Sequence, residues 1–266
     1  MSDSEPFVDI HCHLLPGIDD GAKDWDETLA MAQMAVADGF STIVATPHQL
    51  GSFAQNRGEQ IRAAVVHLQT FLDQHQVPLR VLAGADVRIE TGMLDGLKRG
   101  DVVSLGDHRR HILLELPHEL YVPLDRLVVD LQSMRMVGVL SHPERNQGIL
   151  SQPALVRPLV DAGCLMQVTA GSLTGSFGAP AHKLATWMLD QGLVHFISTD
   201  AHNTRSRRPQ MSPAFAVVAE RMGVETALDL CCRNPALVAA GRNVVGGVRL
   251  SQARSRGSWL GWKKAA

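Results

Sequence analysis

Cysteine, tyrosine and long apolar runs are all scarce in this chain. Its 266 residues include one tyrosine and four cysteines, and the cysteine spacing matches neither a disulfide framework nor a CxxC zinc site. No run of about 18 apolar residues is present, so we expect no membrane span. The first residues are polar and acidic, unlike the basic start and apolar core of a secretion signal. These absences predict a cytoplasmic protein.

An excess of charge of either sign is also missing. The formal net charge is −2, and the 45% hydrophobic and 20% charged residues are typical of a globular protein. Without a basic field, we expect no nucleic-acid partner. A barrel of this length usually forms one domain, which we assign to residues 1–250. Residues 251–266 are a basic tail with two tryptophans, either a frayed end or a docking segment for a membrane surface or a partner.

The apolar periodicity predicts short strands that alternate with helices. Helices are expected over residues 24–38, 57–75, 124–135, 154–162, 183–191, 213–222 and 224–233. Strands are expected over residues 9–13, 42–45, 79–83, 111–114, 137–140, 165–168 and 194–198. This alternation indicates the α/β class, with a parallel sheet covered by helices, and seven strands suggest a closed or nearly closed barrel.

The expected strand ends carry residue types that bind metals. His11 and His13 share one face of the first strand because side chains alternate along a strand, although such a pair alone also fits a solvated turn. In parallel barrels the carboxyl ends of the strands supply the functional side chains. Six of the seven ends here carry His, Asp or Glu, which solvated end groups explain poorly. With one further aspartate, the nine candidate ligands are His11, His13, Asp20, His48, Asp86, Glu115, His142, Asp200 and His202.

Nine donors exceed the roughly three to six protein ligands of one ion, so we expect two or three ions. Imidazole and carboxylate ligands without thiolate favour Mn, Fe or Zn, and such clusters hydrolyse phosphate esters. Arg145 and Arg207 follow candidate ligands and could bind the phosphate. Either arginine alone would be explained more simply by a surface salt bridge, and Arg205 or Arg208 is an alternative to Arg207.

Together the motifs resemble the PHP (polymerase and histidinol phosphatase) superfamily. The similar stretches are residues 9–22, 45–48, 84–86, 114–116, 141–145 and 198–203. Asp19-Asp20-Gly21 and the His-Pro-Glu-Arg run at 142–145 are most similar to the CpsB/YwqE-type bacterial manganese-dependent protein-tyrosine phosphatases. The resemblance runs from about residue 8 to about residue 240, and it implies a distorted (β/α)7 barrel and a trinuclear site in which Mn²⁺ is the expected metal.

The resemblance also implies roles for the candidate residues. The first ion would be held by His11, His13, Asp86 and Asp200, the second by Asp86 as a bridge with Glu115 and His142, and the third by Asp20, His48 and His202. Arg145 and Arg207 would contact the phosphate. A metal-bound hydroxide would then attack phosphorus in line, and the phenolate would leave.

Two features depart from the family pattern. The family usually has Glu where this chain has Asp86, whose side chain is one methylene shorter. After His48 the family often has a basic, glycine-containing loop, whereas residues 49–56 contain no basic residue. The first departure concerns the metal bridge and the second concerns the surface that a peptide substrate would meet.

Three functions remain open at this stage. The first is hydrolysis of phosphotyrosine, on the tail of a bacterial tyrosine kinase that controls capsule or exopolysaccharide synthesis. The second is a PHP-type phosphoesterase acting on a small phosphomonoester, or a nuclease, although the net charge disfavours a nuclease. The third is a metal-binding protein that has lost enzymatic activity because the Asp86 side chain is shorter than the usual Glu. The oligomeric state is left open.

Overall fold

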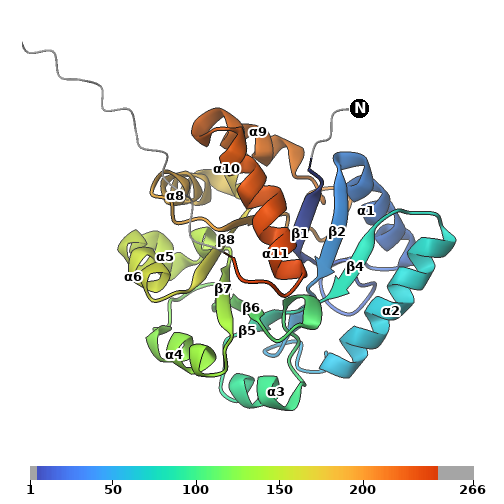
Figure 1. The fold of residues 1–266 in the computed structure, drawn as a ribbon, viewed down its shortest axis with the longest axis horizontal. Helices are drawn as coiled ribbons and strands as arrows, with labels where there is room; N and C mark the ends of the chain where they lie inside the picture. The colour runs from blue at the N-terminus through green and yellow to red at the C-terminus, as the bar shows by residue number, and fades with distance from the viewer. Residues whose placement is uncertain (1–4, 245–266) are drawn as a thin grey trace, which may run out of the picture.

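A ring of parallel strands occupies the middle of the computed structural model, which describes residues 5–244 (Figure 1). The strands are β1 (Phe7–Cys12), β2 (Phe40–Ala45), β3 (His48–Gln49), β4 (Arg80–Ala83), β5 (Asp86–Arg88), β6 (His111–Glu115), β7 (Val137–Ser141), β8 (Leu165–Thr169) and β9 (Phe196–Ser198). They pair in the orders β1-β2-β4 and β3-β5-β6-β7-β8-β9. All these pairs are parallel, as expected for the α/β class.

Seven strand positions make up the ring, because two of them are interrupted. Pro47, which has no N–H to donate, separates β2 from β3, and Gly84 and Ala85 separate β4 from β5. The first and last positions meet through an isolated parallel bridge between Cys12 and Ala201. The architecture is therefore the expected distorted barrel with seven strand positions.

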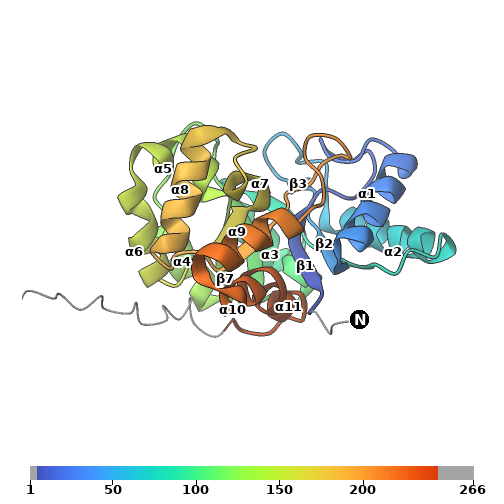
Figure 2. The ribbon, with the colours of Figure 1, turned by 90° about the horizontal axis from the view of Figure 1, so that it is seen from above.

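The helices lie outside the strands. They are α1 (Trp25–Asp38), α2 (Gly58–Gln74), α3 (Met93–Arg99), α4 (Asp125–Ser133), α5 (Gln147–Ser151), α6 (Val156–Asp161), α7 (Ala170–Leu173), α8 (Gly178–Asp190), α9 (Ser212–Met222), α10 (Val224–Leu228) and α11 (Asn234–Ala239). Figure 2 shows α10 and α11 at one end of the ring and α7 and β3 at the other. Among residues 5–244, no helix has the length and apolar character needed to cross a bilayer.

Local sequence signals explain the longest helices. The Asp24 side chain accepts a hydrogen bond from the backbone N–H of Glu27 and starts α1, and Gly39, with φ of 104°, ends it. Helix α2 buries four apolar residues at helical spacing, Ile61, Val65, Leu68 and Leu72. These two helices match the predicted ranges to within one residue at each end.

The differences from the prediction concern short elements. Strands β3 and β5 and helices α3, α5 and α7 were not expected, because they span 2, 3, 7, 5 and 4 residues and are too short to show a period. The helix expected over residues 183–191 begins earlier, at Gly178, and ends at Asp190. The helix expected over residues 224–233 is α10 followed by a π-helical turn at Asp229–Arg233, and α11 continues from it. The predicted tail, residues 251–266, lies outside the described residues.

Two apolar cores support the ring. The larger lies between strands and helices, and the smaller includes Val8, Ile10 and Phe196 and is closed at one end by Val238 of α11. The register of β1 against β2 shifts between Asp9 and Cys12, as in a β-bulge. This bulge lets β1 contribute both to the smaller core and to the site at the carboxyl ends of the strands.

Candidate metal centre

All nine predicted ligands come together at the carboxyl ends of the strands. Their ligand atoms form four groups, and within each group the atoms lie within 4.8 Å of one another. The groups are His13 with Asp20, His48 and His202; His11 with His142 and Asp200; His11 with His13 and Asp86; and His48 with Asp86 and Glu115. Because four residues belong to two groups each, the donors form one continuous cluster with room for more than one ion.

The grouping overlaps with the one implied by the family resemblance but does not repeat it. His142 lies with His11 and Asp200, and its Nε2 is 3.9 Å from Asp86 Oδ2. His48, placed with a third ion by the resemblance, also lies with Asp86 and Glu115. His48 therefore faces two donor groups, with Nε2 3.4 Å from Asp20 Oδ1 and Nδ1 3.5 Å from Asp86 Oδ2, and the neutral ring can bind an ion through only one of these nitrogens.

Three of the histidines are held by a hydrogen bond at Nδ1. The Nδ1 of His11 contacts Gln167 Oε1 at 2.9 Å, and the Nδ1 of His13 contacts Asp19 Oδ2 at 2.7 Å. The Nδ1 of His202 contacts the backbone oxygen of Asp200 at 3.0 Å. Since each partner is an acceptor, each ring carries its proton on Nδ1 and presents the Nε2 lone pair to the cluster, as metal-binding histidines do.

His11 in β1 and His13 just after it provide a direct test of whether a cation fits. Their Nε2 atoms are 3.3 Å apart, and Nδ1 protonation leaves a lone pair on each of them. Burial lowers the pKa of His11 to about 3 and that of His13 to about 4, so both rings are neutral at pH 7. Two facing lone pairs repel each other, and a cation bound by both nitrogens would remove this repulsion.

Asp86 provides a second test of whether a cation fits the cluster. It is fully buried, and within residues 5–244 neither carboxylate oxygen has a hydrogen-bond partner. Burial, with the charges of Glu115 and Asp200, raises the pKa of Asp86 well above its usual range. The Oδ2 atom nevertheless lies 3.5 Å from both His11 Nε2 and His48 Nδ1, so the shorter side chain still reaches the cluster. A bound cation would satisfy both oxygens.

The two predicted arginines converge on one carboxylate. Arg145 and Arg207 both donate to Asp200 Oδ2, while Asp200 Oδ1 faces His11 Nε2 at 3.3 Å. Burial alone would raise the pKa of Asp200, but His11, Arg207 and Arg145 hold it well below the usual range. The guanidinium carbons of Arg145 and Arg207 lie 4.3 and 5.8 Å from the centre of the Phe177 ring. The structure thus places Arg207, rather than Arg205 or Arg208, on the cluster.

Backbone strain marks two of the strand ends. His142 and Asp200 have φ of 33° and 51°, in the left-handed region that residues other than glycine seldom occupy. Each such residue costs about 1–3 kcal/mol, and such strain gathers at functional sites. The conformation turns both side chains toward the cluster immediately after β7 and β9.

The loop after His48 has its own contacts. Phe53 stacks on the His48 ring, with centroids 5.3 Å apart and planes at 19°. Arg88, from β5, lies with this loop around a pocket of about 200 Å³ and approaches Glu115 at 3.6 Å. Arg88 thus supplies a cation beside the loop, which has none of its own. Glu90 accepts a hydrogen bond from the backbone of the loop and is not among the ligand groups.

Sequence reasoning did not assign roles to several supporting residues. Asp19 was named only as part of the Asp19-Asp20-Gly21 motif, without a role of its own, and Gln167 could have been noticed because it lies near the end of a predicted strand. Phe177 follows a helical turn, and no local pattern marks it. These residues do not belong to the ligand groups, and they orient the residues that do.

Known proteins resemble this chain over most of its length. Residues 7–240 match the family model described as capsular polysaccharide synthesis, CpsB/CapC. The tyrosine-protein phosphatase YwqE of Bacillus subtilis (strain 168) is 37% identical over 221 residues, 82% of this chain and 86% of that protein. The tyrosine-protein phosphatase CpsB of Streptococcus pneumoniae is 26% identical over 86% of this chain and 96% of that protein.

A solved structure agrees with these relatives. A crystal structure from work on YwqE of B. subtilis and CpsB of S. pneumoniae, described as unique metal-dependent tyrosine phosphatases, superimposes with a TM-score of 0.84 at 34% identity. The match covers 90% of this chain and 96% of that one. The similarity therefore extends over the barrel and the strand ends that carry the cluster.

Proposed function

The chain belongs to the CpsB/CapC family, and we propose that it is a metal-dependent phosphatase that hydrolyses phosphotyrosine in a protein substrate. The observation that carries the proposal is the cluster of nine donors, five of which are buried. In that cluster the Asp86 carboxylate has no hydrogen-bond partner within the described residues. Two arginines, Arg145 and Arg207, pair with Asp200 at the edge of the cluster. Metal-assisted phosphate-ester hydrolysis uses cations and hydrogen-bond donors at the phosphoryl oxygens, and the cluster supplies ligands for the cations and two arginines as donors.

The residues around the cluster would have distinct roles in hydrolysis. When bound, divalent ions lower the pKa of water and neutralise charge on the phosphoryl oxygens. Arg145 and Arg207 would donate to the remaining oxygens and oppose the charge that develops on them. Asp200 and Phe177 hold both guanidinium groups before the substrate arrives. A phenol has a pKa of about 10, so its anion is a good leaving group and charge stabilisation is the main requirement.

The proposal also covers the identity of the metal ion, the substrate protein and the cellular compartment. The nine proposed ligands are nitrogen and oxygen donors, which suits Mn²⁺, with Fe or Zn as alternatives. The family description places such proteins in capsular polysaccharide synthesis, which supports the phosphotyrosine-bearing tail of a bacterial tyrosine kinase as the substrate. The four cysteines are unpaired and buried, which supports a reducing compartment such as the cytoplasm.

The test is phosphate release from a phosphotyrosyl peptide by metal-stripped protein, before and after Mn²⁺ is added. We expect activity only with the metal, and we expect His142→Ala to lower it by about 100-fold or more because a ligand is lost. His75→Ala is the matched control, since His75 lies exposed at the end of α2. Turnover of p-nitrophenyl phosphate without peptide hydrolysis would instead indicate a phosphatase for small phosphomonoesters.

Asp86→Glu tests the departure from the family pattern. In one outcome of the test above, the metal-loaded parent protein hydrolyses neither the phosphotyrosyl peptide nor p-nitrophenyl phosphate. If the short Asp86 side chain is the reason, Asp86→Glu should restore hydrolysis. Failure of Asp86→Glu as well, at full metal occupancy, would contradict a phosphatase function and favour a metal-binding protein without activity.

A further inference from the structure

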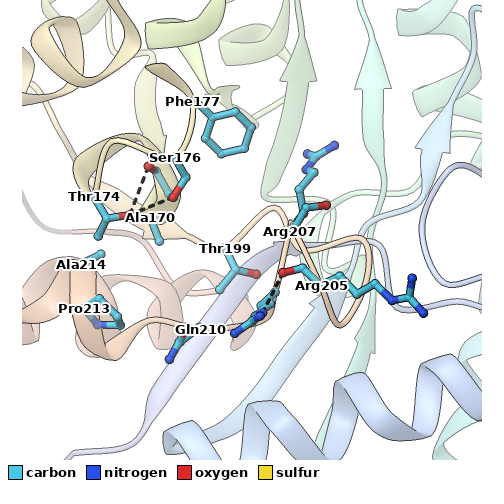
Figure 3. A pocket seen from close by; sticks show the side chains of 13 residues that line it. Ala170, Thr174, Ser176, Phe177, Thr199, Arg205, Arg207, Gln210, Pro213 and Ala214 are labelled. Atoms are coloured by element: carbon cyan, nitrogen blue, oxygen red, sulfur yellow. Dashed lines mark hydrogen bonds between the residues drawn. The ribbon is translucent and has the colours of Figure 1, made fainter. Parts of the chain in front are cut away.

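A second pocket adjoins the candidate metal centre on the side of Arg207. It has a volume of about 260 Å³ and lies between α7, the turn before α8, the loop after β9 and the start of α9 (Figure 3). We name it the Arg208 pocket. The residues that line it include Thr174, Ser176, Phe177, Arg207, Arg208 and Gln210. Arg207 and Phe177 line this pocket and also belong to the proposed phosphate site, so the two sites adjoin each other.

The charge of the lining is of one sign. Three arginines line the pocket, at positions 205, 207 and 208, and no aspartate or glutamate does. Arg207 is paired with Asp200, whereas Arg205 and Arg208 are exposed, and no carboxylate within residues 5–244 forms an ion pair with either. Unpaired cations around a concave surface favour an anionic ligand.

The loop that carries these arginines is held in place by its own backbone contacts. Asn203 Oδ1 accepts hydrogen bonds from the backbone N–H groups of Arg205, Ser206 and Arg207. The Nε of Arg208 donates to the backbone oxygen of Arg205 at 2.8 Å. Figure 3 shows the Arg205 side chain pointing away from Thr174 and Ser176. Arg208, which also lines the pocket, is then the other exposed arginine that can meet a ligand there.

The opposite wall offers hydroxyl groups. Thr174 Oγ1 and Ser176 Oγ lie 3.3 Å apart, and Thr174 donates to the backbone oxygen of Gly171 at 3.2 Å. A hydroxyl can rotate to donate to an acceptor, so Ser176 can bind a carboxylate that an arginine holds from the other side. The pocket therefore combines a cation with neutral donors, which suits a single acidic side chain.

We propose that the Arg208 pocket binds an acidic side chain of the protein substrate that lies close in sequence to the phosphotyrosine. The pocket shares Arg207 and Phe177 with the proposed phosphate site, and consecutive Cα atoms are about 3.8 Å apart, so a residue one or two positions from the phosphotyrosine would lie near the pocket. The inference rests on the proposed function and adds a sequence preference to it.

The experiment compares two phosphotyrosyl peptides that differ only in Glu or Gln beside the phosphotyrosine, on either side in turn. With the Mn²⁺-loaded full chain we expect kcat/KM to be about threefold to tenfold higher for a Glu peptide, mainly through KM. The preference should shrink at 1 M salt, which screens partly exposed charges. Equal rates for all Glu and Gln peptides would overturn the inference and leave the proposed function intact.

Variants assign the preference to the pocket. Arg208→Ala should abolish it and Arg208→Lys should restore part of it, while Arg126→Ala, an exposed arginine on α4 with 87% of its side chain accessible, should leave it unchanged. A preference that survives Arg208→Ala would overturn the assignment. Hydrolysis of p-nitrophenyl phosphate without release from any peptide would overturn the proposed function, and this inference with it.

Discussion

At the scale of single residues, the site depends on the groups that orient the proposed ligands. Asp19 has no place in the ligand groups, yet it accepts hydrogen bonds from His13 Nδ1 and from the backbone N–H of His48 at 2.9 Å. Burial alone would raise its pKa, but the bond with His13 lowers the pKa below its usual value. Asp19 is therefore ionised at pH 7 and fixes the proton of His13 on Nδ1.

Asp19→Asn should weaken metal binding and, because the buried carboxylate accepts hydrogen bonds from His13, Gly21 and His48, lower the free energy of unfolding by about 1–3 kcal/mol. The amide is a weaker acceptor than the carboxylate, so His13 is less firmly held with its Nε2 lone pair toward the cluster. We expect the dissociation constant for Mn²⁺ to rise about 10-fold to 100-fold, as measured by titration calorimetry. Asp26→Asn, an exposed position in α1, is the control, and equal affinities for the two variants would contradict this role of Asp19.

At the scale of elements, the loop from β1 to α1 is packed tightly against the residue that it must position. A Cβ at Gly21 would lie 2.4 Å from the His13 oxygen and 2.5 Å from His13 Cβ. Ala22 N donates to the same oxygen at 3.2 Å. Only glycine allows this close approach, which brings Asp20 back toward His13 and His202.

Gly21→Ala should therefore destabilise the loop and the centre together. The clash involves backbone and Cβ atoms that cannot rotate away, so we expect a loss of about 1–3 kcal/mol in the free energy of unfolding and weaker Mn²⁺ binding. Gly92→Ala is the control: its φ of 89° strains an alanine, but no atom lies within 4 Å of the added Cβ. Chemical denaturation measures both, and unaltered Mn²⁺ affinity in Gly21→Ala would show that the loop tolerates the change.

At the scale of the whole molecule, buried neutral histidines couple stability to pH. Burial lowers the pKa of both His111 and His195 to about 4. His195 Nδ1 accepts a hydrogen bond from the backbone N–H of Met166 at 3.1 Å, and a protonated ring could not accept it. The unfolded chain takes up the His195 proton near pH 6.5, but the folded chain takes it up only near pH 4.

The free energy of unfolding should therefore fall as the pH is lowered from about 6.5 to 4, by up to about 3 kcal/mol for His195 alone. His195→Asn keeps an acceptor for Met166 N–H but does not titrate, so its stability should depend less steeply on pH in this window. Denaturation of metal-free protein at several pH values measures the difference. Parallel pH curves for variant and parent would contradict the assignment.

Local sequence patterns sufficed for much of the fold because their causes are local. The period of apolar residues and the caps at Asp24 and Gly39 define α1 from within its own segment. Strands β3 and β5 arise from interruptions at Pro47 and Gly84, which become visible only when neighbouring strands pair. The short helices α3 and α7 contain too few residues to show a period.

The sequence by itself determined the α/β alternation, the nine candidate ligands and the two arginines, because donor-bearing residues directly follow apolar strands and resemble a known set of motifs. Only the tertiary structure decided how those donors divide into groups, since His48 and His142 take their neighbours from strands far apart in the sequence. It also decided the partners of Asp19, Gln167 and Phe177. Hydrogen bonds and ring contacts between distant segments depend on how the barrel brings its strand ends together, and no local pattern contains that information.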